Sequence, residues 1–168
     1  MHGPQVRTDI VDVYVFRRPR LDASASAVEF LQLRRTGGAM PGTWQPVMGH
    51  VEAAERAMDA ALRELTEETG LRPGHGLAAL WQLETVNTYF LATQDHVMLS
   101  PCFAAEALHD AELRLDETHD AHRWVQRDMV DRLFLWPGQR AAVDHIVRDI
   151  VSTDSPMAQH LRLDIGNA

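Results

Sequence analysis

The stretch "GHVEAAERAMDAALRELTEETGL", Gly49 to Leu71 of this 168-residue chain, groups carboxylates that could hold a metal ion. On a helix that advances about 100° per residue, Glu64, Glu67 and Glu68 fall within an arc of roughly 100°. Like charges at positions i and i+4 cost a helix about 0.2–0.5 kcal/mol, so stability alone does not favour them. Mg²⁺ reverses that cost, because it joins one or two carboxylates to the oxygens of a phosphate. The stretch therefore predicts a metal platform for an anionic substrate.

A helix from Ala54 to Thr69 is expected to carry these carboxylates. Its apolar residues recur at helical spacing from Met58 to Leu65, and Gly70 is placed as the stop. The preceding "RRTGGAMPGTWQPVMGH" is rich in Gly and Pro and predicts a loop that lines the site, with room only for a short strand at Trp44 to Met48.

The fixed positions of the stretch form a longer pattern than the acidic doublet alone. An acidic helix face is usually just solvated, and the doublet by itself would favour that reading. The full pattern is Gly49, five residues, Glu55, seven residues, Arg63-Glu64-Leu65, one residue, Glu67-Glu68, one residue and Gly70-Leu71. It resembles the Nudix box at every fixed position, and chance would produce it with a probability on the order of one in ten million.

This resemblance implies a Nudix hydrolase of α+β class, with an α/β/α sandwich around a mixed sheet. Such enzymes cleave nucleoside diphosphates linked to a further group and use Mg²⁺ or Mn²⁺. By position in the box, the implied metal ligands are the carboxylates and one carbonyl of Glu64, Glu67, Glu68 and Gly49. Glu55 and Arg63 would be the pair that orients the ligand helix.

The general base is left open between a box glutamate, Glu67 or Glu68, and a carboxylate from another loop. Many family members place a glutamate directly before a histidine, six residues ahead of a tryptophan. This chain has Thr118 there, in "LDETHDAHRW", so Glu117 becomes the candidate extra base or ligand, with Asp120 close by. Zinc is disfavoured at the histidines of this loop, because the chain has a single cysteine.

Three further residues are candidates for binding the substrate. Arg34 and Arg35 end a predicted strand and could meet terminal phosphates. Trp44 could belong to the core or stack on a base, and we favour stacking because it follows the Gly/Pro-rich loop.

The segments "FLQLRR", "WQPVMGHVE" and "HRWV" are similar to the bacterial subgroup that acts on dATP and dihydroneopterin triphosphate. We therefore predict cleavage of a nucleoside or pterin triphosphate to the monophosphate and pyrophosphate. The alternatives are another nucleoside diphosphate derivative, such as a dinucleoside polyphosphate or ADP-ribose, and a nucleotide-binding regulatory module without hydrolysis. The intact box disfavours the module.

From the pattern of the whole chain we predict one domain over residues 1–151 and a C-terminal tail over residues 152–168. Alternating residues predict half-buried strands at Asp9 to Arg17 and Val28 to Arg34. Further strands are expected at Leu80 to Tyr89, Val97 to Ala105 and His122 to Val125, and helices at Asp128 to Phe134 and Gly138 to Val151.

The net charge of −8 and scattered basic residues disfavour a nucleic-acid polymer as partner. No apolar run reaches the length of about 18 residues that a membrane span needs, so we expect no membrane contact. The lone cysteine fits a cytoplasmic location. A homodimer is left open.

We expect Glu68→Gln to abolish most turnover without unfolding the chain, because it removes a ligand charge and preserves shape. A loss of about three orders of magnitude in kcat corresponds to roughly 4 kcal/mol of transition-state stabilisation. Steady-state kinetics measure the loss, and circular dichroism must be unchanged. Activity within a few fold of the wild type would show that the metal-platform assignment is wrong.

Overall fold

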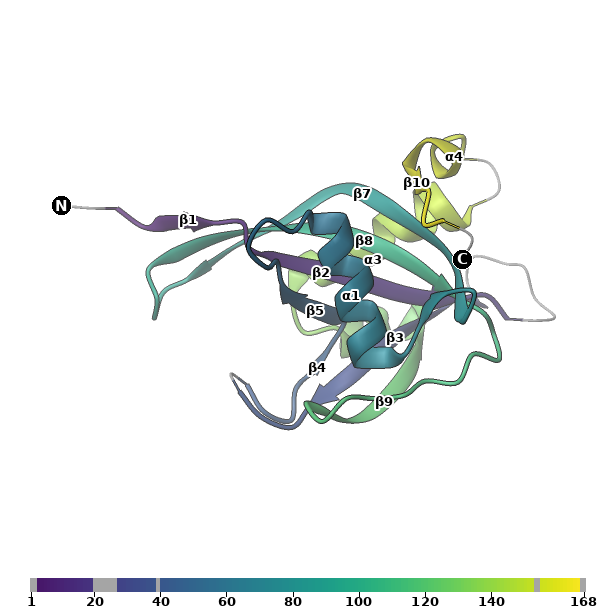
Figure 1. The fold of residues 1–168 in the computed structure, drawn as a ribbon, viewed down its shortest axis with the longest axis horizontal. Helices are drawn as coiled ribbons and strands as arrows, with labels where there is room; N and C mark the ends of the chain where they lie inside the picture. The colour runs from purple at the N-terminus through teal and green to yellow at the C-terminus, as the bar shows by residue number, and fades with distance from the viewer. Residues whose placement is uncertain (1–2, 20–26, 39, 153–154, 167–168) are drawn as a thin grey trace.

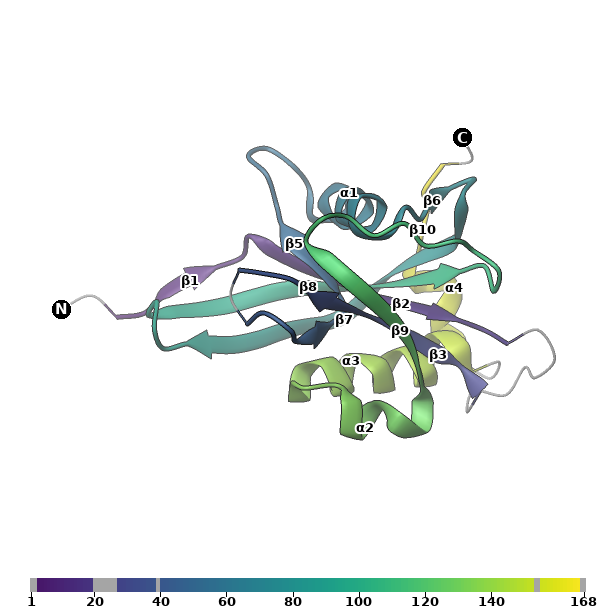
Figure 2. The same ribbon diagram turned by 90° about the horizontal axis from the view of Figure 1, so that it is seen from below.

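A mixed β-sheet lies between two layers of helices in the computed structural model, which describes residues 3–19, 27–38, 40–152 and 155–166. One helix, α1, covers one face of the sheet, and α2 and α3 cover the other (Figures 1 and 2). This three-layer arrangement confirms the predicted α/β/α sandwich. No helix among the described residues is long and apolar enough to cross a membrane.

The strands and helices follow one another along the chain in an order that alternates strand-rich and helical segments. The strands are β1 (Gln5–Arg7), β2 (Ile10–Arg17), β3 (Glu29–Arg35), β4 (Trp44–Gln45), β5 (Val47–His50), β6 (Arg72–Pro73), β7 (Gly76–Leu91), β8 (His96–Ala107), β9 (His119–Gln126) and β10 (Arg162–Leu163). The helices are α1 (Ala57–Thr69), α2 (Val130–Leu133), α3 (Pro137–Ile146) and α4 (Met157–Leu161), with short 3₁₀ and π segments at Arg127–Met129 and Val147–Val151.

The sheet has the strand order β10-β7-β8-β2-β3-β4, with β1 on β8, β5 on β2, β6 on β7 and β9 on β3. Strands β2 and β8 run parallel, whereas β2 pairs antiparallel with both β3 and β5. This register places β5, and therefore the entry to α1, directly beside the middle of the sheet.

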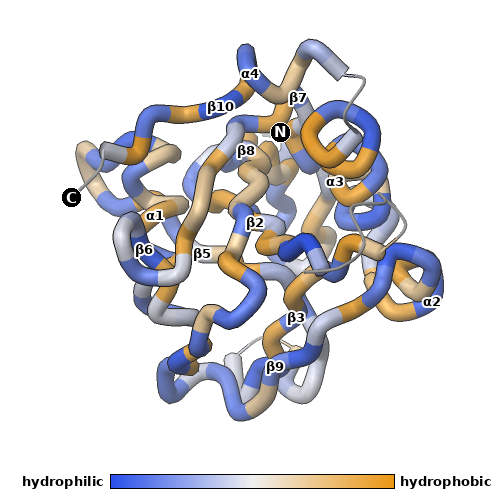
Figure 3. Tube along the Cα trace, turned by 90° about the vertical axis from the view of Figure 1, so that its right-hand side faces the viewer, coloured by the Kyte–Doolittle hydropathy of each residue, from blue (hydrophilic) through white to orange (hydrophobic). Residues whose placement is uncertain are grey.

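Strand β2 is buried on both faces, so the prediction of a half-buried strand is wrong for its central residues. Val11, Val13 and Val15 pack toward α1, while Tyr14 and Phe16 pack toward α3. Two helical layers leave neither face to solvent, and the strand is accordingly almost continuously apolar. Figure 3 shows hydrophobic and hydrophilic segments alternating along α2 and α3, as expected for helices that lie with one side on a sheet.

Two predicted boundaries shift for reasons of backbone chemistry. The single strand predicted from Trp44 to Met48 is divided at Pro46 into β4, which pairs with β3, and β5, which pairs with β2. Proline has no N–H to donate to a ladder, so the chain changes partner there. Helix α1 begins at Ala57 rather than Ala54, because Ala54 has a positive φ of 65° that a helix does not contain.

The sequence predicted no helix or strand after Ser152, but the described part of this segment contains α4 and β10. Strand β10 pairs antiparallel with β7, where Arg162 lies opposite Trp81. Leu161 is buried in the core beneath α3, and the indole N–H of Trp81 donates to the carbonyl of Ala158. This segment therefore packs on the sheet of the main domain.

A buried polar cluster interrupts the core on the α3 side of the sheet. Asp12 is 3% exposed, and Asn87 donates from Nδ2 to both Asp12 Oδ2 and the hydroxyl of Tyr14. Asp12 Oδ1 and Asn87 Oδ1 have no partner among the described residues. Burial raises the pKa of Asp12 to about 6, and hydrogen bonds from Asn87 and Ser100 offset only part of that effect.

We expect Asp12→Asn to stabilise the protein above pH 7 and to have little effect near pH 4. A folded-state pKa above the unfolded value means that Asp12 favours folding at low pH, and that this contribution is lost as the pH rises through about 6. A rise from 3.8 to about 6 corresponds to about 3 kcal/mol. Melting temperatures of variant and wild type between pH 4 and 8 measure the difference, with the exposed Asp131→Asn as control. A pH-independent difference would contradict this account.

Candidate active site

The stretch from Gly49 to Leu71 forms the end of β5, a tight loop and helix α1, which lies against the sheet. Gly70 ends α1 in the left-handed conformation, with φ 77°, and its N–H donates to the carbonyl of Thr66. A residue with a Cβ is strained in this conformation, which explains the glycine at the helix end. The packed apolar side of α1, including Leu65, is buried against β2, and the acidic residues lie beside it.

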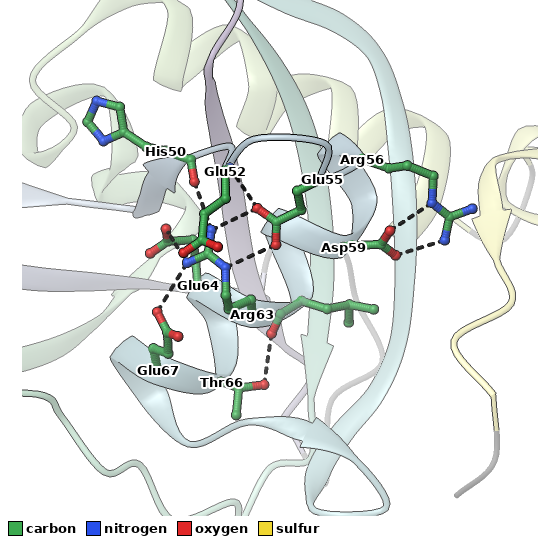
Figure 4. A network of polar contacts seen from close by, with 10 residues as sticks. His50, Glu52, Glu55, Arg56, Asp59, Arg63, Glu64, Thr66 and Glu67 are labelled. Atoms are coloured by element: carbon green, nitrogen blue, oxygen red, sulfur yellow. Dashed lines mark hydrogen bonds and ion pairs between the residues drawn. The ribbon is translucent and has the colours of Figure 1, made fainter.

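Arg63 binds the carboxylates of the site together (Figure 4). Its guanidinium donates from Nε and Nη2 to the two oxygens of Glu55 at 3.0 Å each, and from Nη1 to Glu64 at 2.8 Å and Glu67 at 3.2 Å. Nη2 also donates to the carbonyl of His50 at 2.8 Å. Hydrogen bonding to Arg63 is the main reason that the pKa of Glu55 lies below its usual value. The predicted Glu55–Arg63 pair is therefore present in the structure.

Glu64 lies directly against the backbone of Gly49, between β5 and α1. A Cβ at position 49 would come within 1.9 Å of Glu64 Cδ, so only glycine leaves room for this carboxylate. The side chain of Glu64 is 14% exposed. The strand and the helix thus bring the Gly49 backbone and the Glu64 carboxylate together, as the ligand prediction requires.

Glu68 is the most deeply buried carboxylate of the box, with 7% of its surface exposed. Its Oε2 has no partner among the described residues. Burial, followed by the negative charges of Glu64 and Asp116, raises the pKa of Glu68 to about 8, against the lowering effect of the Met48 backbone N–H and of Arg35. A buried carboxylate oxygen that has no partner and lies beside other carboxylates is stabilised by a positive charge.

The box carboxylates fit a divalent cation, although they are held apart here. Glu64 and Glu67 bind Arg63, and the described residues contain no group of three acidic, His or Cys side chains close enough to hold an ion. Mg²⁺ keeps several waters and needs only one or two carboxylates, so it does not require three convergent ligands. The unpartnered Oε2 of Glu68 and the Gly49–Glu64 contact are the observations that fit the ion.

The two predicted arginines have different surroundings. Arg34 forms a bidentate ion pair with Asp120, with Nε to Oδ1 at 2.7 Å and Nη2 to Oδ2 at 3.0 Å. Arg35 forms no ion pair with a described residue, and its charge acts to lower the pKa of Glu68. The role of both arginines in binding phosphate stays a prediction.

Trp44 is half-buried and lies beside two guanidinium groups. Arg123 is 4.3 Å from the ring centroid and Arg34 is 5.8 Å from it. Two hydrogen bonds from Arg123 to the buried Gln32 hold that guanidinium in place. Stacking of Trp44 on a base stays a prediction, and no local pattern in the sequence predicts the contact of Arg123 with the ring.

The loop between β8 and β9 brings an acidic residue that sequence reasoning did not single out. The charge of Asp116 contributes to the raised pKa of Glu68, while the role of Glu117 as an extra base or ligand stays a prediction. Glu117 is exposed, and its carbonyl accepts a hydrogen bond from the hydroxyl of Thr36. The signal that could have found Asp116 is its spacing of three residues before His119, which allows the two side chains to bond across one turn.

The fold, together with the acidic residues of the box on helix α1, is typical of a class of metal-dependent hydrolases. The chain matches the NUDIX domain over residues 8–146, and it belongs to that family. It is a hydrolase that acts on phosphoric anhydride bonds.

Two relatives and one solved structure show the extent of the similarity. The bis(5'-nucleosyl)-tetraphosphatase [asymmetrical] of Rattus norvegicus is 28% identical over 142 residues, which cover 83% of this chain and 92% of that protein. The protein of the same name from Sus scrofa is 30% identical over 132 residues, or 77% of this chain and 86% of that protein. A C. elegans Ap4A hydrolase binary complex superposes with a TM-score of 0.66 at 19% identity, covering 84% of this chain and 96% of that one.

We expect Gly49→Ala to reduce kcat/KM by on the order of 100-fold, because the new Cβ displaces Glu64 and misplaced catalytic groups lose activity on this scale. Gly37→Ala is the matched control, since a Cβ there meets nothing within 4 Å. Steady-state kinetics and the melting temperature are measured on both variants. Equal activity in the two would contradict the role assigned to the Gly49–Glu64 contact.

Proposed function

We propose that this protein is a divalent-metal-dependent hydrolase that cleaves dinucleoside polyphosphates asymmetrically. The observation that carries the proposal is the complete box site, on a chain whose similarity to an asymmetrical bis(5'-nucleosyl)-tetraphosphatase extends over 83% of its length. Unequal division of four phosphates gives one nucleoside monophosphate and one nucleoside triphosphate. The similarity favours the dinucleoside alternative over the triphosphate substrate that the short sequence segments suggested.

The box residues divide the chemical work between holding charge and holding position. Glu64, Glu67 and Glu68 would hold the cation, together with the carbonyl of Gly49. When bound, a divalent cation supplies positive charge against the phosphate oxygens and makes a water more acidic. Arg63 keeps the helix and its carboxylates in place through Glu55 and the carbonyl of His50.

Arginines at the end of β3 supply the attraction for a polyphosphate that the net charge of −8 does not. Arg35 lies where its charge reaches Glu68, so it is placed to meet a phosphate oxygen near the cation. Arg123 lies beside Trp44 and adds a second positive group, whereas the charge of Arg34 is paired with Asp120. A substrate with four phosphates and a second nucleoside can contact more of these groups than a nucleoside triphosphate can.

The experiment compares diadenosine tetraphosphate with dATP, dihydroneopterin triphosphate and ADP-ribose under Mg²⁺ and under Mn²⁺. We expect kcat/KM for diadenosine tetraphosphate to exceed the others by at least about tenfold, which corresponds to about 1.4 kcal/mol. Chromatography of the products should show AMP and ATP in equal amounts.

The Glu68→Gln variant, purified in parallel, controls for a contaminating phosphatase. Release of pyrophosphate from dATP or dihydroneopterin triphosphate at the higher efficiency would instead support the triphosphate reading. Saturable nucleotide binding without turnover under either metal would support a regulatory module.

A further inference from the structure

Strand β3 lies between β4 and β9, and it carries polar side chains on the face of the sheet opposite α1. Arg123 of β9 is paired with Gln32 of β3. Trp44 of β4 is paired with Arg34, two residues further along β3. Because paired residues, and residues two apart on a strand, point to the same face, the side chains of these four residues share one face.

The guanidinium of Arg123 reaches across β3 to the ring of Trp44, 4.3 Å from its centroid. Its Nε and Nη2 donate to Oε1 of Gln32 at 2.9 and 2.7 Å. Gln32 is fully buried, and its Nε2 donates to the carbonyl of Leu133, at the end of α2, at 3.4 Å. The direction of the guanidinium is therefore set by a buried amide that is itself held by a neighbouring element.

The positive charge of Arg123 is not neutralised by any described residue. Arg34 is paired with Asp120, whereas no described carboxylate forms an ion pair with Arg123. Burial lowers the pKa of Arg123, and no carboxylate among the described residues offsets this effect. Its Nη1 has no hydrogen-bond partner in the described part of the chain, so one edge of the planar group can donate to a further acceptor.

The choice of an amide rather than a carboxylate at position 32 separates two roles for this arginine. A glutamate there could accept the same two hydrogen bonds, and bonds between ionised partners are the stronger ones. An arginine that served only to support Trp44 would therefore be held better by a glutamate. Gln32 instead fixes the guanidinium and leaves its charge available, in a protein whose net charge is −8.

We propose that Arg123 binds a phosphate of the substrate and that Gln32 is its positioning residue. The inference deepens the proposed function and rests on it only in requiring a polyphosphate substrate. The chain leads from Trp44 through Pro46 into β5 and to Gly49 of the box. Five extended residues span at most about 18 Å, a distance over which several linked phosphates and a nucleoside can extend. Arg123 is thus a contact for the part of the substrate that lies away from the cation.

The test is a calorimetric titration of the full chain with inorganic tripolyphosphate at one fixed concentration of Mg²⁺. We expect Arg123→Gln to weaken tripolyphosphate binding by at least about tenfold, because it removes a charge-assisted donor that is already oriented. Arg132→Gln is the matched control, since it removes the same charge from an exposed position on α2 and should bind as the wild type does. The melting temperature is recorded on each variant.

The Gln32→Glu variant distinguishes phosphate binding from support of Trp44. It keeps the shape and both acceptor contacts of residue 32 but neutralises Arg123, so we expect tripolyphosphate binding to weaken while the chain stays folded. Wild-type affinity in Arg123→Gln, or in folded Gln32→Glu, would overturn the inference. Absence of tripolyphosphate binding by the wild type would overturn it as well.

Steady-state kinetics with diadenosine tetraphosphate give an independent measurement on Arg123→Gln. We expect KM to rise by at least about tenfold and kcat to stay within a few fold, as removal of a contact made equally in the ground state and the transition state does. A fall in kcat at unchanged KM would overturn the inference. A raised KM with unchanged tripolyphosphate affinity would also overturn it, because Arg123 would then act through Trp44 rather than on a phosphate.

The tripolyphosphate titration contains no nucleotide and therefore separates this inference from the proposed function. Weakened tripolyphosphate binding in Arg123→Gln, together with no cleavage of diadenosine tetraphosphate by the wild type, would reject the proposed substrate and support the role of Arg123. Cleavage of that substrate by the wild type, with unchanged tripolyphosphate binding and unchanged KM in Arg123→Gln, would do the reverse.

Discussion

The guanidinium of Arg63 is the interaction on which the site depends, because it binds three carboxylates and a carbonyl at once. Its contacts to Glu55 and to the carbonyl of His50 join helix α1 to the loop and strand that precede it. Its contacts to Glu64 and Glu67 offset the repulsion that these acidic residues would otherwise exert on each other. Arginine suits this role because its planar donors meet several oxygens in fixed directions.

The sheet turns this local network into a site by placing other elements around it. Strand β5 pairs with β2 and brings the backbone of Gly49 against Glu64, while the end of β3 brings Arg35 toward Glu68. The loop before β9 carries Asp116, whose charge contributes to the raised pKa of Glu68. Charged residues from separate parts of the chain therefore act on one buried carboxylate that has an unpartnered oxygen.

The opposite face of the sheet has a different balance of forces. Beneath α3, Asp12 is buried with Asn87 and Tyr14, and its raised pKa shows that the folded state favours the neutral carboxyl. Burial of an ionisable group without an opposite charge lowers stability when that group ionises. Arg63 therefore balances Glu55, Glu64 and Glu67 on the α1 face, whereas Asp12 on the α3 face, like Glu68 on the α1 face, has a pKa that burial raises.

The sequence by itself determined the box and its helix, because these depend on short-range features, and the resemblance of the box to a known family then implied the sandwich. The spacing of Glu55 ahead of the helix, and of Arg63 and the three glutamates along it, can be read directly, and Gly70 marks the helix end through its backbone freedom. Only the tertiary structure decided which residues from distant segments reach the site. Asp116 contributes to the raised pKa of Glu68, and Arg34 pairs with Asp120 whereas Arg35 forms no ion pair with a described residue, because strand register and loop contacts set side-chain direction over separations that no local pattern encodes.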